Sequence, residues 1–275
     1  MEAQARTTGI ADINGAAVSF EMARRERGPT LVLVHAGIAD SRMWDDQFAA
    51  FADVGSVLRY DLRGYGKSTL PPGPYAHHED LFALLAALDI PRAVVIGASM
   101  GGGVAASLAI AHPEMVQGLV LVNSLVGGPE PADDLRAVWR AVDALVTSGD
   151  LDAANELELR AWVDGPHRTP DEVAPAVRER VRVMNGALLA RANEYEQAEE
   201  RELEPPADDR LAEIAAPALA ITGEMDQPEA LAAAEAQLAA IPDARGETIA
   251  NAAHLPSIEH PDEFNRYVLA FVESL

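Results

Sequence analysis

The chain has 275 residues, 49% of them hydrophobic and 24% charged, which is typical of a globular enzyme built on one large domain or a domain with an insertion. Its 44 acidic and 21 basic residues give a formal charge of −23, which disfavours nucleic acids and anionic membranes as partners. Cysteine is absent, which excludes disulfides and thiolate metal sites. Solubility accounts for so acidic a surface, and steering of cationic substrates is the alternative explanation.

Short strand-like runs alternate with helical patterns along most of the chain. The predicted strands are Ala17–Arg24, Leu31–His35, Val54–Tyr60, Ala93–Gly97, Gly118–Val122, Ala218–Thr222 and a last one near Glu247–Ile249. The predicted helices are Arg42–Phe51, Glu79–Leu88, Met100–His112, Glu229–Ala240 and Asp262–Ser274. Several strands are continuous apolar runs, as expected of strands buried on both faces. The pattern predicts an α/β fold, a mostly parallel central sheet with helices on both faces.

The alternation breaks between residues 127 and 206. This segment opens with Gly127-Gly-Pro-Glu-Pro, closes with Glu204-Pro-Pro, and carries apolar residues at helical spacing without a strand pattern. The sequence therefore predicts a helical cap, residues 127–206, inserted between two strands of a core formed by residues 1–126 and 207–275.

The strongest chemical signal is Gly97-Ala-Ser99-Met-Gly101, which lies between a predicted strand and a predicted helix. A serine at so sharp a turn has a strained backbone that lifts its hydroxyl out of the sheet, and glycines two positions away avoid clashes. The following helix begins with unpaired N–H groups that stabilise a developing oxyanion. We therefore predict that Ser99 is a catalytic nucleophile.

A serine nucleophile needs a base and an acid that orients the base, and at this kind of turn they follow in the order serine, acid, histidine. His254 lies after the last predicted strand and before the last helix, so it is the predicted base. Asp226 follows the strand at 218–222, in a loop that faces the site, and is preferred to Glu224 as the orienting acid.

The oxyanion formed in such a reaction needs two N–H donors. The backbone N–H of Met100 directly follows the nucleophile, and the loop after the strand at 31–35 supplies the second donor. That loop contains Gly37, which we assign as the second donor, while His35 is assigned to bracing the loop.

Three further patterns resemble ligand sites but each lacks a required element. Gly64-Tyr-Gly-Lys-Ser resembles the end of a phosphate-binding loop, but Asp61 stands where that motif needs glycine. Gly101-x-Gly103 begins inside a helix rather than at a strand end, unlike a dinucleotide fingerprint. His77 and His78 lie beside acids, but consecutive residues do not share a helix face, so no metal site is predicted.

The chain resembles the α/β-hydrolase superfamily on five landmarks in order: His35-Ala-Gly, Asp61-Leu-Arg-Gly-Tyr-Gly-Lys-Ser, Gly97-Ala-Ser-Met-Gly, Gly223-Glu-Met-Asp and Ala253-His. It is further similar to 3-oxoadipate enol-lactonases at residues 59–64, 71–75 and 252–261, although the loop at His35 departs from the Asn-Ser-Leu-Gly type usual there. The dehalogenases and epoxide hydrolases of the superfamily carry aspartate where Ser99 stands. The resemblance therefore implies serine chemistry.

The predicted reaction is hydrolysis of a carboxylic ester or lactone through an acyl-enzyme, with Ser99, His254 and Asp226 as the triad. Two alternatives stay open: the same triad cleaving a C–C bond of a β-diketone-like substrate, and a ligand-binding protein with little turnover. No metal or organic cofactor is predicted, and the expected partner is a small-molecule substrate. Because neither a signal peptide nor a membrane span is evident, the predicted location is cytoplasmic; a homo-oligomer stays open.

Substrate recognition is expected to come from the predicted cap, because a cap covers the carboxyl edge of the sheet where the catalytic groups meet. Trp139 and Trp162 are its candidate substrate-binding surfaces. The candidate anchors for a substrate carboxylate are Arg136, Arg140, Arg160 and Arg168.

Overall fold

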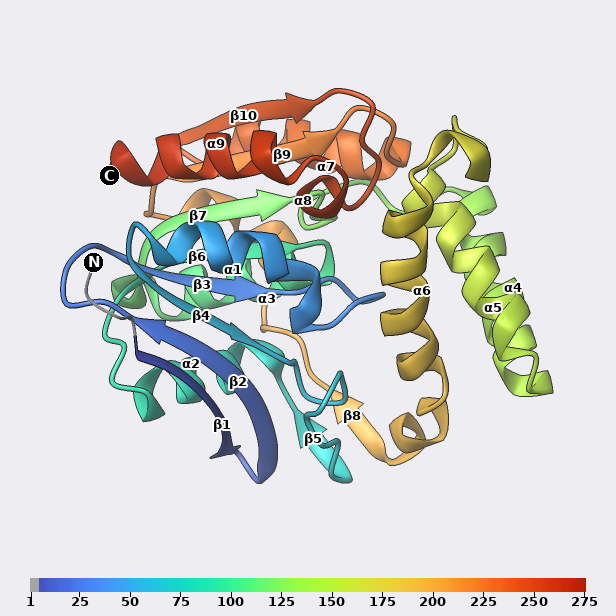
Figure 1. Ribbon diagram of the computed structural model, residues 1–275, viewed down its shortest axis with the longest axis horizontal. Helices are drawn as coiled ribbons and strands as arrows, with labels where there is room; N and C mark the ends of the chain where they lie inside the picture. Colours follow the sequence, from blue (N-terminus) through green and yellow to red (C-terminus); the bar gives the residue numbers. More distant parts are fainter. Residues whose placement is uncertain (1–4) are drawn as a thin grey trace.

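A computed structural model describes residues 5–275, and its framework is an eight-stranded sheet flanked by helices (Figure 1). The strands of this sheet are β1 (Ala5–Ile13), β2 (Ala16–Arg24), β3 (Thr30–Val34), β4 (Ser56–Tyr60), β6 (Ala93–Ala98), β7 (Val116–Val122), β9 (Ala218–Gly223) and β10 (Ala244–Ile249). Their spatial order is β1-β2-β4-β3-β6-β7-β9-β10. All pairs from β4 to β10 are parallel, and only the pairs made by β2 are antiparallel. The predicted α/β fold with a mostly parallel sheet is confirmed.

The helices occupy most of the predicted helical segments, with ends that differ by a few residues. They are α1 (Asp45–Ala52), α2 (His77–Ala87), α3 (Met100–Ala111), α4 (Asp133–Ser148), α5 (Leu151–Glu158), α6 (Pro175–Leu189), α7 (Pro228–Ala240), α8 (Pro256–Glu259) and α9 (Pro261–Glu273). Both α7 and α9 begin with proline and carry acids in the first turn, where a fixed φ and a negative charge favour helix initiation. No helix among residues 5–275 is long and apolar enough to cross a membrane.

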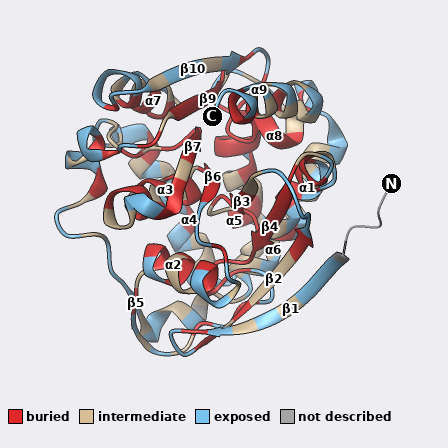
Figure 2. Ribbon diagram, turned by 90° about the vertical axis from the view of Figure 1, so that its left-hand side faces the viewer, coloured by how far each residue is buried: buried red, intermediate tan, exposed pale blue. Residues whose placement is uncertain are grey.

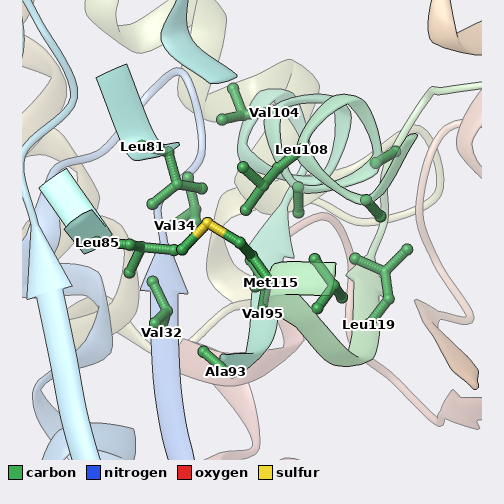
Figure 3. Packing of buried hydrophobic residues seen from close by; sticks show 14 of the residues in the cluster. Val32, Val34, Leu81, Leu85, Ala93, Val95, Val104, Leu108, Met115 and Leu119 are labelled. Atoms are coloured by element: carbon green, nitrogen blue, oxygen red, sulfur yellow. The ribbon is translucent and has the colours of Figure 1, made fainter. Parts of the chain in front are cut away.

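The core lies on both faces of the sheet because alternate side chains of each strand point to opposite sides. On β3, Val32 and Val34 belong to the cluster that includes α2 and α3, whereas Leu31 and Leu33 pack with α1 and α9. Figure 3 shows the first cluster, where Met115 reaches between the sheet and Leu85 of α2. Burial is accordingly concentrated in the central strands (Figure 2).

The edge strand β1 is absent from the sequence prediction. It pairs along its whole length with β2 through a tight turn at Asn14 and Gly15, both with positive φ. Figure 2 shows most of β1 exposed, and Ile13 is its buried end. An exposed edge strand carries little of the apolar patterning by which buried strands are identified, but Asn-Gly is a strong hairpin signal.

Between β7 and β9 the chain forms α4, α5, a π-helix η3 (Leu159–Asp164) and α6, as the helical pattern of this segment predicts. In Figure 1, α4, α5 and α6 lie at the end of the sheet toward which β3 and β7 point. The segment also contains a strand, β8 (Ala198–Glu200), which contradicts the expectation that it has none. β8 pairs in parallel with β5 (Gly73–Tyr75), which precedes α2, and so ties the segment to the core.

Candidate active site

Ser99 lies at the sharp turn between β6 and α3. Its φ of 51° and ψ of −118° are strained for a residue with a side chain. A Cβ on Gly97 would lie 2.1 Å from the carbonyl oxygen of Gly101, and a Cβ on Gly101 would lie 2.5 Å from that of His35. Neither position can hold a side chain, so this turn forms only with the two glycines that the sequence places there.

His254 and Asp226 form a buried pair at the carboxyl edge of the sheet. Asp226 follows β9 and His254 follows β10, and the distance from Nδ1 of His254 to Oδ2 of Asp226 is 2.7 Å. The other carboxylate oxygen of Asp226 accepts a 2.7 Å hydrogen bond from the N–H of Gln227. The competing acid, Glu224, is exposed and instead accepts a hydrogen bond from the N–H of Asn251.

Ser99 and His254 line the same cavity, of about 500 Å³, at this edge. Asp226 has no exposed surface and lies behind the imidazole. Trp162 of η3 packs against the histidine, with ring centroids 4.5 Å apart, and its carbonyl accepts the backbone N–H of His254. The imidazole is therefore held by a carboxylate on one side and by an indole from the 127–206 segment on another.

Two backbone donors lie beside Ser99. Gly37 and Met100 both line the cavity. A Cβ on Gly37 would lie 3.7 Å from the sulfur of Met100, so the two residues are close neighbours. Within residues 5–275, neither the N–H of Gly37 nor that of Met100 donates a hydrogen bond. Free N–H groups in this arrangement can stabilise an oxyanion.

His35 braces the loop that carries Gly37. Its Nε2 accepts the N–H of Leu62 at 2.9 Å, so its Nδ1 carries the proton and donates to the carbonyl of Ala36 at 2.9 Å. Burial lowers the pKa of His35, which keeps the ring neutral in this role. With both ring nitrogens bonded to backbone groups, His35 has no free nitrogen for chemistry.

The loop at Asp61 is also structural. Its carboxylate accepts the backbone N–H groups of Ser41 and Lys67, and Gly66 packs against it with a φ of 49°. An acid therefore occupies the place that phosphate would need in a phosphate-binding loop. Within the described part of the chain, no group of three or more His, Asp or Glu side chains is placed to hold a metal ion.

Of the predicted recognition residues, both tryptophans line the cavity and the four arginines do not. Trp139 is 37% exposed and Trp162 is buried. Three of the arginines contact carboxylates: Arg136 contacts Glu130 and Asp133, Arg160 contacts Asp164, and Arg168 contacts Glu259. Pairing with nearby acids, which are abundant in this chain, directs these guanidinium groups away from the cavity. None of the four candidate anchors for a substrate carboxylate therefore lies in the cavity wall.

The cavity wall is instead acidic. It includes Glu158 of α5 together with Glu200, Glu202 and Asp208, and Arg201 is its one arginine. The side chain of Arg201 is exposed and lies 3.5 Å from that of Glu199, which does not line the cavity. Burial raises the pKa of both Glu158 and Glu200, and the neighbouring Glu202 raises that of Glu200 further. Sequence reasoning missed this wall, because β8 reaches the cavity only by pairing with distant β5.

His77, the first residue of α2, is a second buried imidazole of the same cavity. Burial lowers its pKa to about 3, with smaller contributions from His35, Arg63 and His78. Both of its ring nitrogens lack a hydrogen-bond partner within residues 5–275. The sequence gives no signal for this, because the helical pattern around His77 is compatible with an exposed first turn.

Comparison with known proteins agrees with this geometry. The family model of the alpha/beta hydrolase fold matches residues 29–261. The chain is 29% identical over 252 residues to 3-oxoadipate enol-lactonase 2 of Acinetobacter baylyi, with 89% of each chain covered. A crystal structure of a hydrolase from Pseudomonas aeruginosa is 30% identical, with a TM-score of 0.79 and coverage of 97% of this chain and 98% of that one. The enol-lactonase of Burkholderia xenovorans is 28% identical, with a TM-score of 0.78 and coverage of 96% and 99%. The chain belongs to the alpha/beta hydrolase fold family.

Proposed function

We propose that this protein hydrolyses a carboxylic ester or lactone, with Ser99 as the nucleophile. The observation that carries the proposal is the 2.7 Å contact between His254 and Asp226 at a cavity that a strained Ser99 also lines. The carboxylate keeps the proton of His254 on Nδ1 and leaves Nε2 as an acceptor for the serine proton.

In this mechanism Ser99 Oγ attacks the carbonyl carbon while Nε2 of His254 takes its proton. The N–H groups of Gly37 and Met100 stabilise the tetrahedral oxyanion, and the imidazolium returns its proton to the leaving alcohol. Water then attacks the acyl-enzyme with His254 again as the base. Every group in this sequence is supplied by the chain itself.

The ester or lactone substrate is supported by the names of the similar proteins, two of which are enol-lactonases. We further propose residues 127–206 as a cap that forms the cavity wall, since Trp139, Glu158 and Trp162 of this segment line the cavity. In this arrangement the sheet edge supplies the reacting groups and residues 127–206 supply part of the cavity wall that contacts the substrate.

A fluorophosphonate probe tests the proposal, because it reacts only with an activated serine. We expect labelling of the wild type at Ser99, none in Ser99→Ala, and hydrolysis of members of a panel of simple esters and lactones. Hydrolysis confined to β-diketones would identify a C–C hydrolase, and binding of panel compounds without labelling or turnover would identify a binding protein. Either of those results contradicts the proposal.

A further inference from the structure

The His77 side chain lies at the cavity wall with its hydrogen-bonding capacity unused within residues 5–275. It is 2% exposed, its ring contacts that of Tyr75 edge-on with centroids 5.1 Å apart, and both of its nitrogens are without hydrogen-bond partners in the described chain. Buried polar groups in native proteins almost always have partners, so a water or a ligand in the cavity supplies the partner of His77.

The nearest carboxylate to His77 is that of Glu200. The distance from Nε2 of His77 to Oε1 of Glu200 is 3.8 Å, which is too long for a direct hydrogen bond. It is short enough for one nitrogen atom, placed between them, to be at hydrogen-bond distance from both. With its proton on Nδ1, the neutral imidazole offers an acceptor at Nε2, and the carboxylate offers acceptors only, so a group with two hydrogen-bond donors, such as an ammonium, satisfies both.

The rest of the wall favours a positive charge at this place. Glu158, Glu200, Glu202 and Asp208 line the cavity against a single exposed Arg201, so a substrate carboxylate would meet acids instead of a basic anchor. The carboxylate of Asp208 already accepts a hydrogen bond from the N–H of Gly127. Glu200 is nearest to the unpartnered imidazole, lines the cavity and is half exposed.

We propose that His77 and Glu200 form a binding site for a protonated amino group, and that the substrate is therefore an ester or lactone bearing a primary or secondary amine. This inference rests on the proposed function, because the site shares a cavity with Ser99. The ammonium donates one N–H to Nε2 of His77 and one to the Glu200 carboxylate, and the reacting carbonyl lies at Ser99. An anionic substrate is disfavoured by the same wall.

Three acetates of equal chain length test the site at pH 7: a methylaminoalkyl ester, its trimethylammonio analogue, which keeps the charge without an N–H, and the neutral carbon isostere. Several chain lengths are measured, because the spacing from carbonyl to amine is what the cavity selects. We expect kcat/KM to fall from the secondary amine to the quaternary ion to the isostere, with about tenfold between the first and last at the best length.

Three variants assign the preference to residues. Glu200→Gln should remove the preference for both cations, and His77→Phe should remove the advantage of the secondary amine over the quaternary ion. Should His77→Phe fold poorly, His77→Leu, which is smaller and also lacks an acceptor, serves the same comparison. Glu199→Gln is the matched control, since it removes the same charge from a residue that does not line the cavity, and it should keep the preference.

A second readout separates this inference from the proposed function. The corresponding amino alcohols should protect Ser99 from fluorophosphonate labelling in the wild type but not in Glu200→Gln. If the esters are hydrolysed with equal kcat/KM and amino alcohols give no more protection than neutral alcohols, the amine site is wrong while the serine hydrolase stands. If Ser99 is not labelled and no ester is hydrolysed, the proposed function fails, and binding of the amino alcohols, measured by calorimetry, still decides the site.

Discussion

Two buried histidines that line one cavity, His254 and His77, differ in the hydrogen-bond partners that the protein gives them. His254 has a carboxylate at 2.7 Å, an indole against its face and a backbone bond to η3, so its orientation is set before any ligand arrives. His77 has its nearest carboxylate at 3.8 Å and no hydrogen bond at either nitrogen within residues 5–275. The comparison suggests a division of labour, in which groups that do chemistry are held by the protein and groups that recognise a ligand are left for the ligand to satisfy.

The largest expected effect comes from removing the proposed catalytic pair of Ser99 and His254. Ser99→Ala and His254→Ala should each lower kcat for a small activated ester by on the order of 10⁴ to 10⁶, because neither residue works without the other. The double variant should be little worse than either single one. Steady-state kinetics on the three variants checks this, and losses that multiply would contradict a shared mechanism.

The orienting role of Asp226 comes next. Asp226→Asn should lower kcat by up to about 10⁴, because an amide stabilises the wrong tautomer of His254 and cannot stabilise the imidazolium. Glu224→Gln is the matched control, since it neutralises an exposed acid two residues away whose carboxylate accepts a hydrogen bond from the N–H of Asn251. Kinetic measurement of both variants decides the assignment, which is lost if Glu224→Gln is the more damaging change.

A buried ion pair beside the catalytic loop should matter for stability and not for substrate choice. Arg168 lies 2.7 Å from Glu259 and also donates to the carbonyl of Asn251, three residues before His254. Arg168→Ala should lower the free energy of unfolding by about 3 kcal/mol, because Glu259 is left buried without its cation. Urea unfolding measures this. The ratio of kcat/KM between neutral and carboxylate-bearing esters should stay unchanged. A shift of tenfold or more in this ratio would mean that Arg168 takes part in substrate recognition.

The smallest effect concerns the pH dependence of stability at His77. Its pKa is about 3 in the folded protein and about 6.5 in the unfolded chain, so between these values only the unfolded chain binds the proton. Stability should therefore fall as the pH drops below about 6.5, and His77 contributes up to about 1.4 kcal/mol per pH unit. In His77→Phe the slope between pH 6 and 4 should be shallower by that amount, measured by urea unfolding at several pH values. Equal slopes would mean that the ring of His77 takes up its proton while the protein is folded.

Local sequence patterns located the strands and the turn that carry the candidate site. Apolar runs located the buried strands, because strands covered on both faces need apolar residues at every position. The turn at Ser99 could be recognised because its strained backbone requires glycine at positions 97 and 101. Both positions lie within two residues of Ser99, so the requirement is visible in the local sequence. The Asn14-Gly15 turn is an equally local signal for the hairpin that contains β1. The strand itself was missed because its residues are mostly polar and exposed and lack an apolar pattern.

What only the tertiary structure decided is which distant residues meet. The order of Ser99, Asp226 and His254 suggested a triad, but the 2.7 Å contact depends on two loops brought together by the parallel pairing of β9 and β10. The place of Glu200 in the acidic wall depends on β8 pairing with β5 across more than a hundred residues, and no local periodicity encodes such a pairing. For the same reason the sequence predicted arginine anchors in the 127–206 segment, whereas packing paired three of them with acids and left His77 beside Glu200. Local backbone strain can be predicted from adjacent residues, but the partners of a buried charge are chosen by the whole fold.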